Sequence, residues 1–257
     1  MKLPISLVII TKNEEKHIAR ALSSVDFCQE KLVIDSSSTD RTVELARELG
    51  ARVIEHPWQG FGLQRRFATE MAVNDWVLFL DADEMVSPEL AEEIQKKFAA
   101  WSPSTALRMP RLSFHMGRWI RHGGWYPDRQ TRLFHRQFAQ WNEAPLHERV
   151  EATTFEDLEH PLFHYVFRDL SHQVVTNDRY STLGAENLAS QGGRFQLWQL
   201  IFRPFGKFME CYFVKLGFLD GLPGFVIAIG AAYSLFLRYA KLWEKSAMSF
   251  QIAKDKK

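Results

Sequence analysis

The sequence predicts an α/β protein with a mostly parallel sheet, followed by a helical C-terminal region rich in aromatic residues. Two observations predict this class. Over the first hundred residues, short runs of β-branched and other apolar residues alternate with segments of helical periodicity, which is the pattern of βαβ units. The last quarter of the chain instead gathers aromatic residues at helical spacing.

Length, charge and cysteine content narrow the class of protein. The 257 residues suffice for one large domain, or for one domain with an appendage. Lysine and arginine (32) nearly balance aspartate and glutamate (31), so no general affinity for nucleic acid is expected. Cys28 and Cys211 lie far apart without metal-site or redox-motif spacing, which suits a reducing cytosol. The N-terminus starts with a strand-like run and shows no cleavable signal, so we predict a cytoplasmic protein.

Three apolar runs and two helical segments form the first part of the predicted sheet. The runs predict strands over residues 3–11, 31–34 and 51–55, the last of them broken by Pro57. Gly50 is expected to end the second helix as its C-cap. The inward faces of the two helices show helical spacing and comprise Ile18, Ala21, Leu22 and Val25 in the first helix and Val43, Ala46 and Leu49 in the second.

A further helix and strand lead to the most informative motif. A helix near residues 64–71 precedes a buried strand over 76–80, which ends at Asp81-Ala82-Asp83. Open α/β sheets bind ligands at this edge, and carboxylates are hard ligands for Mg²⁺ or Mn²⁺, which such sites share with substrate phosphates. We therefore predict a metal that holds a diphosphate. A solvated loop or the nucleophile of an aspartyl phosphatase would also account for the pair taken alone.

Polar residues also follow the other predicted strands. Because the carboxyl ends of parallel strands share one edge, Thr11-Lys12-Asn13-Glu14 and Asp35-Ser36-Ser37-Ser38-Thr39-Asp40 should converge with Asp81-Ala82-Asp83. None of these turns is glycine-rich, which argues against a Walker loop and a dinucleotide-binding G-x-G-x-x-G turn. Side chains must then recognise the nucleotide: Asp35 could accept the imide N–H of a uracil, and Glu14 could bind ribose or a base edge. Asp35 could instead simply cap the serine turn.

The ordered trio of motifs resembles the signatures of family-2 glycosyltransferases with the GT-A fold. Later segments, Gly124-Trp125-Tyr126-Pro127-Asp128-Arg129-Gln130 and Leu146-His147-Glu148, are similar to the bacterial subgroup that builds the lipopolysaccharide inner core. The resemblance implies a GT-A domain over residues 1–170, with a nucleotide-sugar half (1–100) and an acceptor half (101–170). It implies inverting transfer of glucose from a UDP-sugar to a core heptose. Transfer to another lipid-linked acceptor such as polyprenyl phosphate, or a non-catalytic membrane-bound scaffold that binds sugar nucleotide, are the alternatives.

The resemblance also implies roles for individual residues. The expected donor-binding residues are Thr11, Asn13, Glu14, Asp35, Ser37, Arg65 and Asp81, with Arg66 as an alternative to Arg65 at the diphosphate. The expected ligands of Mg²⁺ or Mn²⁺ are Asp83, Asp81 and His164. An isolated histidine beside aromatic residues can also be a packing residue, so the role of His164 stays open.

The middle of the chain is expected to bind the acceptor. Between strands predicted over 106–113 and 129–134, residues 118–128 mix arginines, aromatic residues and a glycine pair, which suit a phosphorylated sugar. Trp119 and Trp125 could instead be core anchors. Inverting transfer needs a base that takes the proton of the acceptor hydroxyl. The position that matches the family is Glu148, and the sequence leaves open whether Glu148, His147 or Asp128 is the base; Glu143 is a further candidate.

Residues 171–257 are predicted to form a helical region that binds a membrane or forms an oligomer. Aromatic residues from Phe195 to Tyr212 recur every three or four positions with basic residues between them, and Pro204 should kink the segment. The apolar run 222–237 contains Pro223, Gly224 and Gly230 and is short for a span, which favours a re-entrant helix. We therefore expect peripheral binding to the cytoplasmic face of the bacterial inner membrane, near a lipid-linked saccharide acceptor. A buried helical hairpin or a homo-oligomer contact is the alternative.

Overall fold

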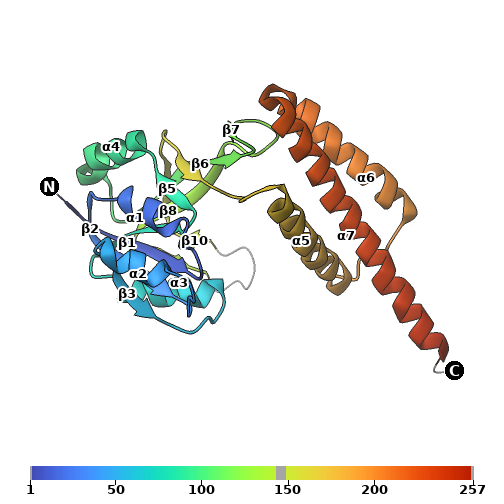
Figure 1. Ribbon diagram of the computed structural model, residues 1–257, viewed down its shortest axis with the longest axis horizontal. Coiled ribbons are helices and arrows are strands. Elements are labelled where there is room, and N and C mark those ends of the chain that lie inside the picture. Colours follow the sequence, from blue (N-terminus) through green and yellow to red (C-terminus); the bar gives the residue numbers. More distant parts are fainter. Residues whose placement is uncertain (1, 143–148, 256–257) are drawn as a thin grey trace. The chain divides into compact units, whose positions relative to one another are not determined.

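The computed structural model describes residues 2–142 and 149–255, with side chains as far as Ser246, and it separates into two compact units (Figure 1). The first unit comprises Met1–Leu112 and Pro127–Tyr165, and the second comprises Ser113–Tyr126 and Val166–Lys257. The first unit therefore holds the predicted nucleotide motifs, whereas the second joins the tip of a β-hairpin to the C-terminal helices.

Strands and helices alternate through the first unit, as the sequence pattern predicts. Its first elements are β1 (Leu3–Thr11), α1 (Ile18–Ser23), β2 (Cys28–Asp35), α2 (Thr42–Glu48), β3 (Arg52–Glu55), α3 (Phe61–Met71), β4 (Trp76–Asp81), β5 (Glu84–Val86), α4 (Pro88–Lys97) and a 3₁₀ turn (Phe98–Ala100). They are followed by β6 (Thr105–His115), β8 (Asp128–His135), β9 (Gln140–Trp141), β10 (Val150–Glu151), β11 (Thr154–Asp157) and β12 (Leu162–His164). The predicted order of elements is thus confirmed up to β4, and β6 and β8 match the strands predicted over 106–113 and 129–134, whereas β5 and the short strands from β9 onward are additions.

The main sheet has a parallel half and an antiparallel half. Its strand order is β3-β2-β1-β4-β8-β6-β12-β5, in which β3, β2, β1 and β4 pair in parallel and β8 pairs antiparallel with β4 and β6. The register places Thr11 opposite Asp35, and Ile10 opposite Asp81. The three predicted motifs therefore meet at one edge of the sheet, and the predicted α/β class is confirmed.

Alternate side chains of β1 enter two separate cores, because successive residues of a strand point to opposite faces. Leu7 and Ile9 pack with α1, α2 and α4, whereas Val8 and Ile10 pack with α3 and the β9–β10 ribbon. Both faces of the parallel strands are thus covered, which explains why these strands are continuous apolar runs rather than alternating ones.

Local signals fix the ends of the helices in this unit. The Ser87 hydroxyl accepts a hydrogen bond from the Leu90 N–H at 3.1 Å, with Pro88 in the first turn of α4. Gly50, at φ +77°, follows the last turn of α2, as predicted for its C-cap.

The second unit is helical apart from β7 (Arg118–Ile120), which pairs with the end of β6. It contains α5 (Leu170–Ser190), α6 (Leu197–Met209), a π-helical turn (Glu210–Val214), a 3₁₀ turn (Gly217–Asp220) and α7 (Gly221–Asp255). Both α5 and α6 pack along α7. The predicted helical, aromatic-rich C-terminal region is confirmed, and α6 remains α-helical through Pro204.

Helix α7 is longer than the apolar run 222–237 suggested. It continues to Asp255, because Pro223 lies in its first turn and its glycines are packing positions rather than breaks. A side chain at Gly224 would lie 1.9 Å from the carbonyl oxygen of Gly217. Within the described residues, the stretch Gly217–Ser246 is long and apolar enough to cross a membrane, and only 22% of its most apolar part is buried.

Candidate active site

The first two motif loops are joined by side-chain hydrogen bonds. The backbone N–H of Asn13 donates to the Ser38 hydroxyl at 2.8 Å, and the Asn13 side-chain oxygen accepts from the Thr39 N–H at 2.8 Å. The Glu14 N–H donates to the Thr42 hydroxyl at 2.8 Å. Asn13 and Ser37 both have positive φ, at 57° and 61°, so each loop turns sharply just beyond its strand. The loops therefore form one preorganised surface at the carboxyl edge of the sheet.

Asp35 lies at the end of β2 and is almost fully buried. Its carboxylate accepts hydrogen bonds from both the backbone N–H and the hydroxyl of Ser38, so it does cap the serine turn. Each carboxylate oxygen has a second lone pair, which leaves acceptor capacity for a base edge. The capping contact and the predicted contact with a uracil are therefore compatible.

Arg65 connects helix α3 to the end of β4. Its Nη2 atom donates to Asp81 Oδ1 at 3.0 Å, and its guanidinium lies 4.5 Å from the ring centroid of Trp141. Asp81, the first aspartate of the motif, is thus held by a cation that itself stacks on an aromatic ring. The contact of Arg65 with the diphosphate stays a prediction, and the structure places its guanidinium against Asp81.

Arg132, in β8, is a buried arginine that the sequence did not single out. Its side chain is only 3% exposed, and Nη2 donates to Asp81 Oδ2 and, at 2.7 Å, to Glu84 Oε1. Burial opposes the charge on Asp81, but Arg132, Arg65 and Arg111 outweigh it and hold the pKa of that carboxyl well below its usual range. Asp81 is therefore ionised and committed to arginines.

A second arginine, Arg111 in β6, continues the same ionic network. It donates to Glu84 Oε1 at 3.1 Å and to Asp128 Oδ2 at 2.9 Å through Nε. The other oxygen of Asp128 accepts from the Gln130 side chain at 2.9 Å. The predicted base candidate Asp128 is thus held against Arg111, and the buried Glu84 joins both arginines to the motif turn by also accepting the Asp81 N–H.

The second aspartate of the motif, Asp83, has a different neighbour. Asp83 Oδ2 lies 3.4 Å from His164 Nε2, and the Asp83 carbonyl accepts the Tyr165 N–H at 2.9 Å. His164 reaches this position because β12 pairs antiparallel with β5, with His164 opposite Glu84. A carboxylate and an imidazole at this separation fit two ligands of one divalent cation, and the mixed set favours Mn²⁺ over the all-oxygen preference of Mg²⁺.

In the described part of the chain, no third histidine, cysteine or acidic side chain joins Asp83 and His164 into a larger metal-ligand group. A cation held here would take its remaining ligands from diphosphate oxygens and water, as Mg²⁺ sites on nucleotides do. Asp81 is predicted as a ligand as well, but its two oxygens face Arg65 and Arg132.

The first unit contains all the described residues that the sequence nominated for catalysis, donor binding and metal binding. These are Thr11, Asn13, Glu14, Asp35, Ser37, Arg65, Asp81, Asp83, Asp128 and His164. The base candidates Glu148, His147 and Glu143 lie outside the described residues. The hairpin residues Trp119 and Trp125 belong to the second unit, where Trp119 packs on Phe114 and Trp125 stacks on His115.

Arg111, Arg132 and Glu84 are the members of this network that sequence reasoning missed. One signal was present: Arg132 stands directly before Leu133 and Phe134 in a predicted strand, and a charged residue there requires a buried partner. Its partner could not be named, because that depends on how β8 aligns with β4.

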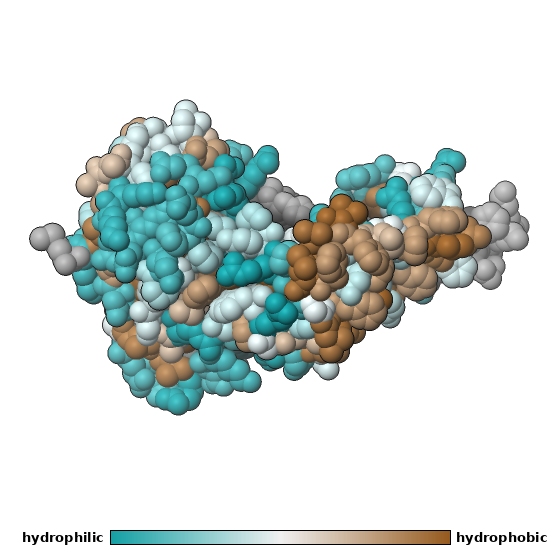
Figure 2. Space-filling model, turned by 90° about the horizontal axis from the view of Figure 1, so that it is seen from above, coloured by the Kyte–Doolittle hydropathy of each residue, from teal (hydrophilic) through white to brown (hydrophobic). Residues whose placement is uncertain are grey.

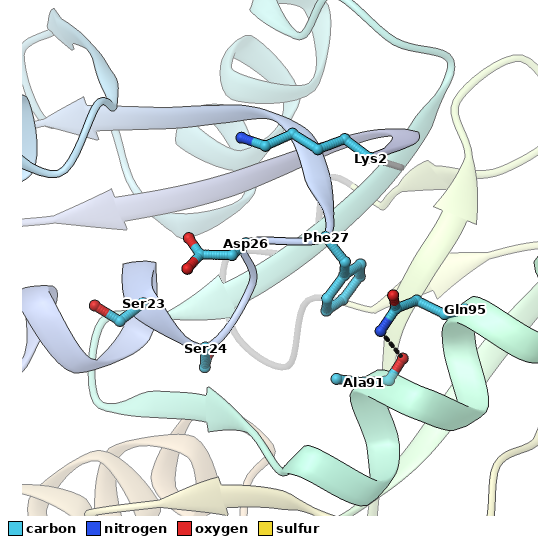
Figure 3. Close-up of a pocket in the computed structure, with 7 residues that line it drawn as sticks. All are labelled: Lys2, Ser23, Ser24, Asp26, Phe27, Ala91 and Gln95. Carbon is cyan, nitrogen blue, oxygen red and sulfur yellow. Dashed lines mark hydrogen bonds between the residues drawn. The ribbon is translucent and has the colours of Figure 1, made fainter.

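A hollow of about 530 Å³ lies at the opposite edge of the sheet, where β1 and β2 begin (Figure 3). Lys2, Ser23, Asp26, Phe27 and Gln95 are among its lining residues, and the Gln95 amide already donates to the Ala91 carbonyl. This hollow is remote from the motif loops, since it lies at the amino ends of the strands, and it brings together no catalytic group.

Known proteins resemble this chain over most of its length. The family model described as Glycosyl transferase family 2 matches residues 6–155. An uncharacterized glycosyltransferase of Rickettsia typhi is 36% identical over 95% of this chain and 88% of its own. The lipopolysaccharide core biosynthesis glycosyltransferase LpsC of Rhizobium meliloti is 29% identical over 96% of this chain and 94% of its own. A crystal structure of S. aureus TarS in complex with UDP-GlcNAc aligns with a TM-score of 0.48 at 17% identity, covering 97% of this chain and 92% of that one.

Proposed function

The chain belongs to glycosyl transferase family 2, and we propose that it transfers glucose from UDP-glucose, with inversion, to a heptose of the lipopolysaccharide inner core. Its GT-A fold supplies the sheet edge at which the three motifs meet. The relative LpsC, named for lipopolysaccharide core biosynthesis and similar over nearly the whole chain, supports this acceptor class.

The observation on which the proposal depends most is the division of labour between the two motif aspartates. Asp81 is neutralised by Arg65 and Arg132, whereas Asp83 faces His164. We infer that Asp83 and His164 hold a Mg²⁺ or Mn²⁺ ion, which would neutralise charge on the departing UDP. Asp81 and Arg65 then lie beside the ribose and diphosphate, and Asp35 and Glu14 bind the nucleoside.

The general base is assigned to Glu148, with His147 and Asp128 as the alternatives. Asp128 is described, and its carboxylate accepts from Arg111 and Gln130, so its present contacts make it a support for Arg111. Glu148→Gln should keep donor binding and lose transfer by about a hundredfold or more. If Asp128→Asn shows that behaviour and Glu148→Gln does not, the two roles are exchanged.

The helical unit is proposed to hold the enzyme on the cytoplasmic face of the inner membrane. Figure 2 shows the hydrophobic surface gathered on this unit, where large side chains of α6 and α7 such as Ile201, Phe202, Phe205 and Ile229 are exposed. An exposed apolar surface of this kind marks a protein or membrane contact.

Radiolabelled nucleotide sugars, offered with lipid-free core saccharide or polyprenyl phosphate, test the function. Transfer from UDP-glucose to the core saccharide is the expected result, and NMR should show that the α-linked glucose of the donor becomes β-linked in the product. Transfer to polyprenyl phosphate instead would mean that this lipid, and not the core heptose, is the acceptor. The absence of both transfer and UDP-sugar hydrolysis would refute the enzymatic function.

A further inference from the structure

The turn between α6 and α7 exposes a dense group of large apolar side chains. We call this group the apolar tip, and it consists of Phe213, Val214, Leu216, Phe218, Leu219 and Leu222. Each of these side chains is at least 43% exposed. Folding alone does not account for so many exposed apolar residues in ten positions, and such a patch normally marks an interaction site.

Leu216 is held in a conformation that disfavours it. Its φ of 55° and ψ of 28° place it in the left-handed region, where glycine or asparagine is the favoured residue. The side chain is nevertheless 45% exposed, so packing inside the unit does not explain a leucine here. Strain at an exposed apolar residue points to a contact made by that side chain outside the fold.

Asp220, at the base of the apolar tip, fastens the tip to the β6–β7 hairpin. This aspartate is 1% exposed and accepts hydrogen bonds from the backbone N–H groups of Arg121 at 3.1 Å and His122 at 2.7 Å. His122 Nδ1 lies 3.2 Å from the other carboxylate oxygen of Asp220, and Arg118 Nη1 donates to the backbone carbonyl of Asp220 at 2.9 Å. We call these contacts the Asp220 clamp.

A second attachment lies beside the clamp. The Gly123 N–H donates to the Lys215 carbonyl at 2.8 Å, and a side chain at Gly124 would lie 2.7 Å from Lys215 Cδ. The glycine pair of the hairpin therefore allows the loop to approach the turn that bears the apolar tip. The clamp and this second contact together hold the loop against the turn that bears the apolar tip.

Basic side chains surround the apolar tip. Arg118 and Arg121 are exposed on the clamped loop, where Arg118 also lies 3.7 Å from the Asp220 carboxylate. Lys207 and Lys215 flank the turn, where both pair with the single carboxylate of Glu210. Apolar side chains bordered by an excess of basic ones are typical of surfaces that enter an anionic bilayer, with the charges at the phosphate level.

We propose that the apolar tip inserts into an anionic phospholipid bilayer, and that the Asp220 clamp thereby holds the β6–β7 loop at the lipid surface. The loop would then lie at the lipid surface, where a lipid-linked acceptor presents its sugar. This role of the loop in acceptor binding rests on the proposed function. Insertion of the tip itself does not depend on that function.

Sedimentation of the full chain with vesicles of phosphatidylethanolamine and phosphatidylglycerol tests insertion. Leu216→Asn combined with Leu219→Gln should weaken binding about tenfold or more, while the asparagine relieves the backbone strain at position 216. Val175→Ser removes an apolar side chain on α5 of the same unit that is 67% exposed, more than either leucine of the tip variant, and as the control it should bind like the wild type. Equal binding by wild type and the tip variant would overturn the proposal.

Hydrogen–deuterium exchange with the same vesicles tests the clamp without any need for an acceptor. In the wild type, vesicles should protect peptides covering both residues 113–126 and 210–222. Asp220→Asn should keep the protection of residues 210–222 and lose the protection of residues 113–126. Arg118→Gln, a milder change at an exposed side chain, should keep the first and lose the second only in part. Retained protection of both segments in both variants would refute the coupling. UDP-sugar hydrolysis, measured in parallel, reports separately whether the proposed function holds.

Discussion

The two units of this chain differ in how much of their apolar surface they bury: the second has only a small apolar cluster, around Ala185, Tyr239 and Leu242, among its described residues. In the first unit, apolar residues fill both faces of the sheet, and several buried charged residues, such as Arg132 and Glu84, form one network at the motif edge. In the second, polar groups such as Gln173, Ser181 and Lys241 lie along the contact between α5 and α7, while large apolar residues face outward. The first unit thus gathers buried charge beside the predicted site, whereas the second leaves large apolar side chains exposed.

The largest effect expected from this comparison is the loss of catalysis without loss of fold when Asp83 is changed. Asp83→Asn should lower turnover about a thousandfold, because the metal ion that binds the diphosphate would lose an anionic ligand. This corresponds to a loss of several kcal/mol of transition-state stabilisation. Its melting temperature should stay within about 2 °C, since the substitution retains the backbone hydrogen bond with Tyr165 and weakens only the 3.4 Å contact of the side chain with His164. Steady-state transfer and calorimetry measure the two effects.

Asp26→Asn is the matched control for Asp83→Asn. Asp26 is an exposed carboxylate of the same unit, at the opposite edge of the sheet. Near-normal transfer by Asp83→Asn at saturating Mn²⁺ would contradict the proposal that Asp83 binds the metal. An equal loss of transfer activity in both variants would contradict it as well.

A second test concerns the buried charges themselves. Arg132→Met should lower the free energy of unfolding by about 3–5 kcal/mol, because it leaves Asp81 and Glu84 without their shared partner. Arg129→Met, on the same strand but with an exposed guanidinium paired to Asp157, should cost about 1 kcal/mol or less. Denaturant unfolding compares the two, and equal losses would show that the network at the motif edge is no stronger than a surface ion pair.

How much of this network the sequence could predict depends on the type of strand pairing. In the parallel half, apolar runs buried on both faces fix which residues end each strand, so Asp35, Asp81 and Asp83 could be placed together. In the antiparallel half, Arg111 meets Asp128 only through the pairing of β6 with β8, and register between distant strands is not encoded in local periodicity.

The length of the last helix was also not predicted. In sequence, the apolar run 222–237, which contains Pro223, Gly224 and Gly230, favoured a short re-entrant helix, and glycine has low helix propensity. In the structure, Gly224 lies against the Gly217 carbonyl, and Gly230 lies against Asn177 and Gln173 of α5. Close approach between segments distant in the chain overrode propensity here, and no local signal distinguishes such a packing glycine from a breaking one.

A third test asks whether buried charge stabilises the first unit away from the motif edge. Burial would raise the pKa of Glu93, but hydrogen bonds from Lys97, His160 and two backbone N–H groups lower it from 4.5 to about 2. Because the folded-state pKa is depressed, the stabilisation is full above pH 4.5 and is lost as pH falls from 4.5 towards 2.

Glu93→Gln should therefore cost about 2–3 kcal/mol at pH 7, and its difference from the wild type should narrow steadily below pH 4.5. Urea unfolding between pH 3 and pH 7 measures this. Glu92→Gln, an exposed neighbour paired only with Lys96, should show no such narrowing. A difference that is constant with pH would mean that Glu93 contributes by packing rather than by charge.

The smallest expected effect lies in the second unit, at Lys241. The Lys241 ammonium donates to the Asp178 carboxylate and to the hydroxyls of Ser181 and Thr182, joining α7 to α5. Asp178 is 56% exposed, so solvent screens this pair far more than the Arg132 pairs. Lys241→Met should consequently change the free energy of unfolding by about 1 kcal/mol or less and leave vesicle binding unaltered. A loss of 3 kcal/mol or more would show that the α5–α7 contact is a buried polar core of the same kind as the motif edge, and the contrast between the two units would then fail.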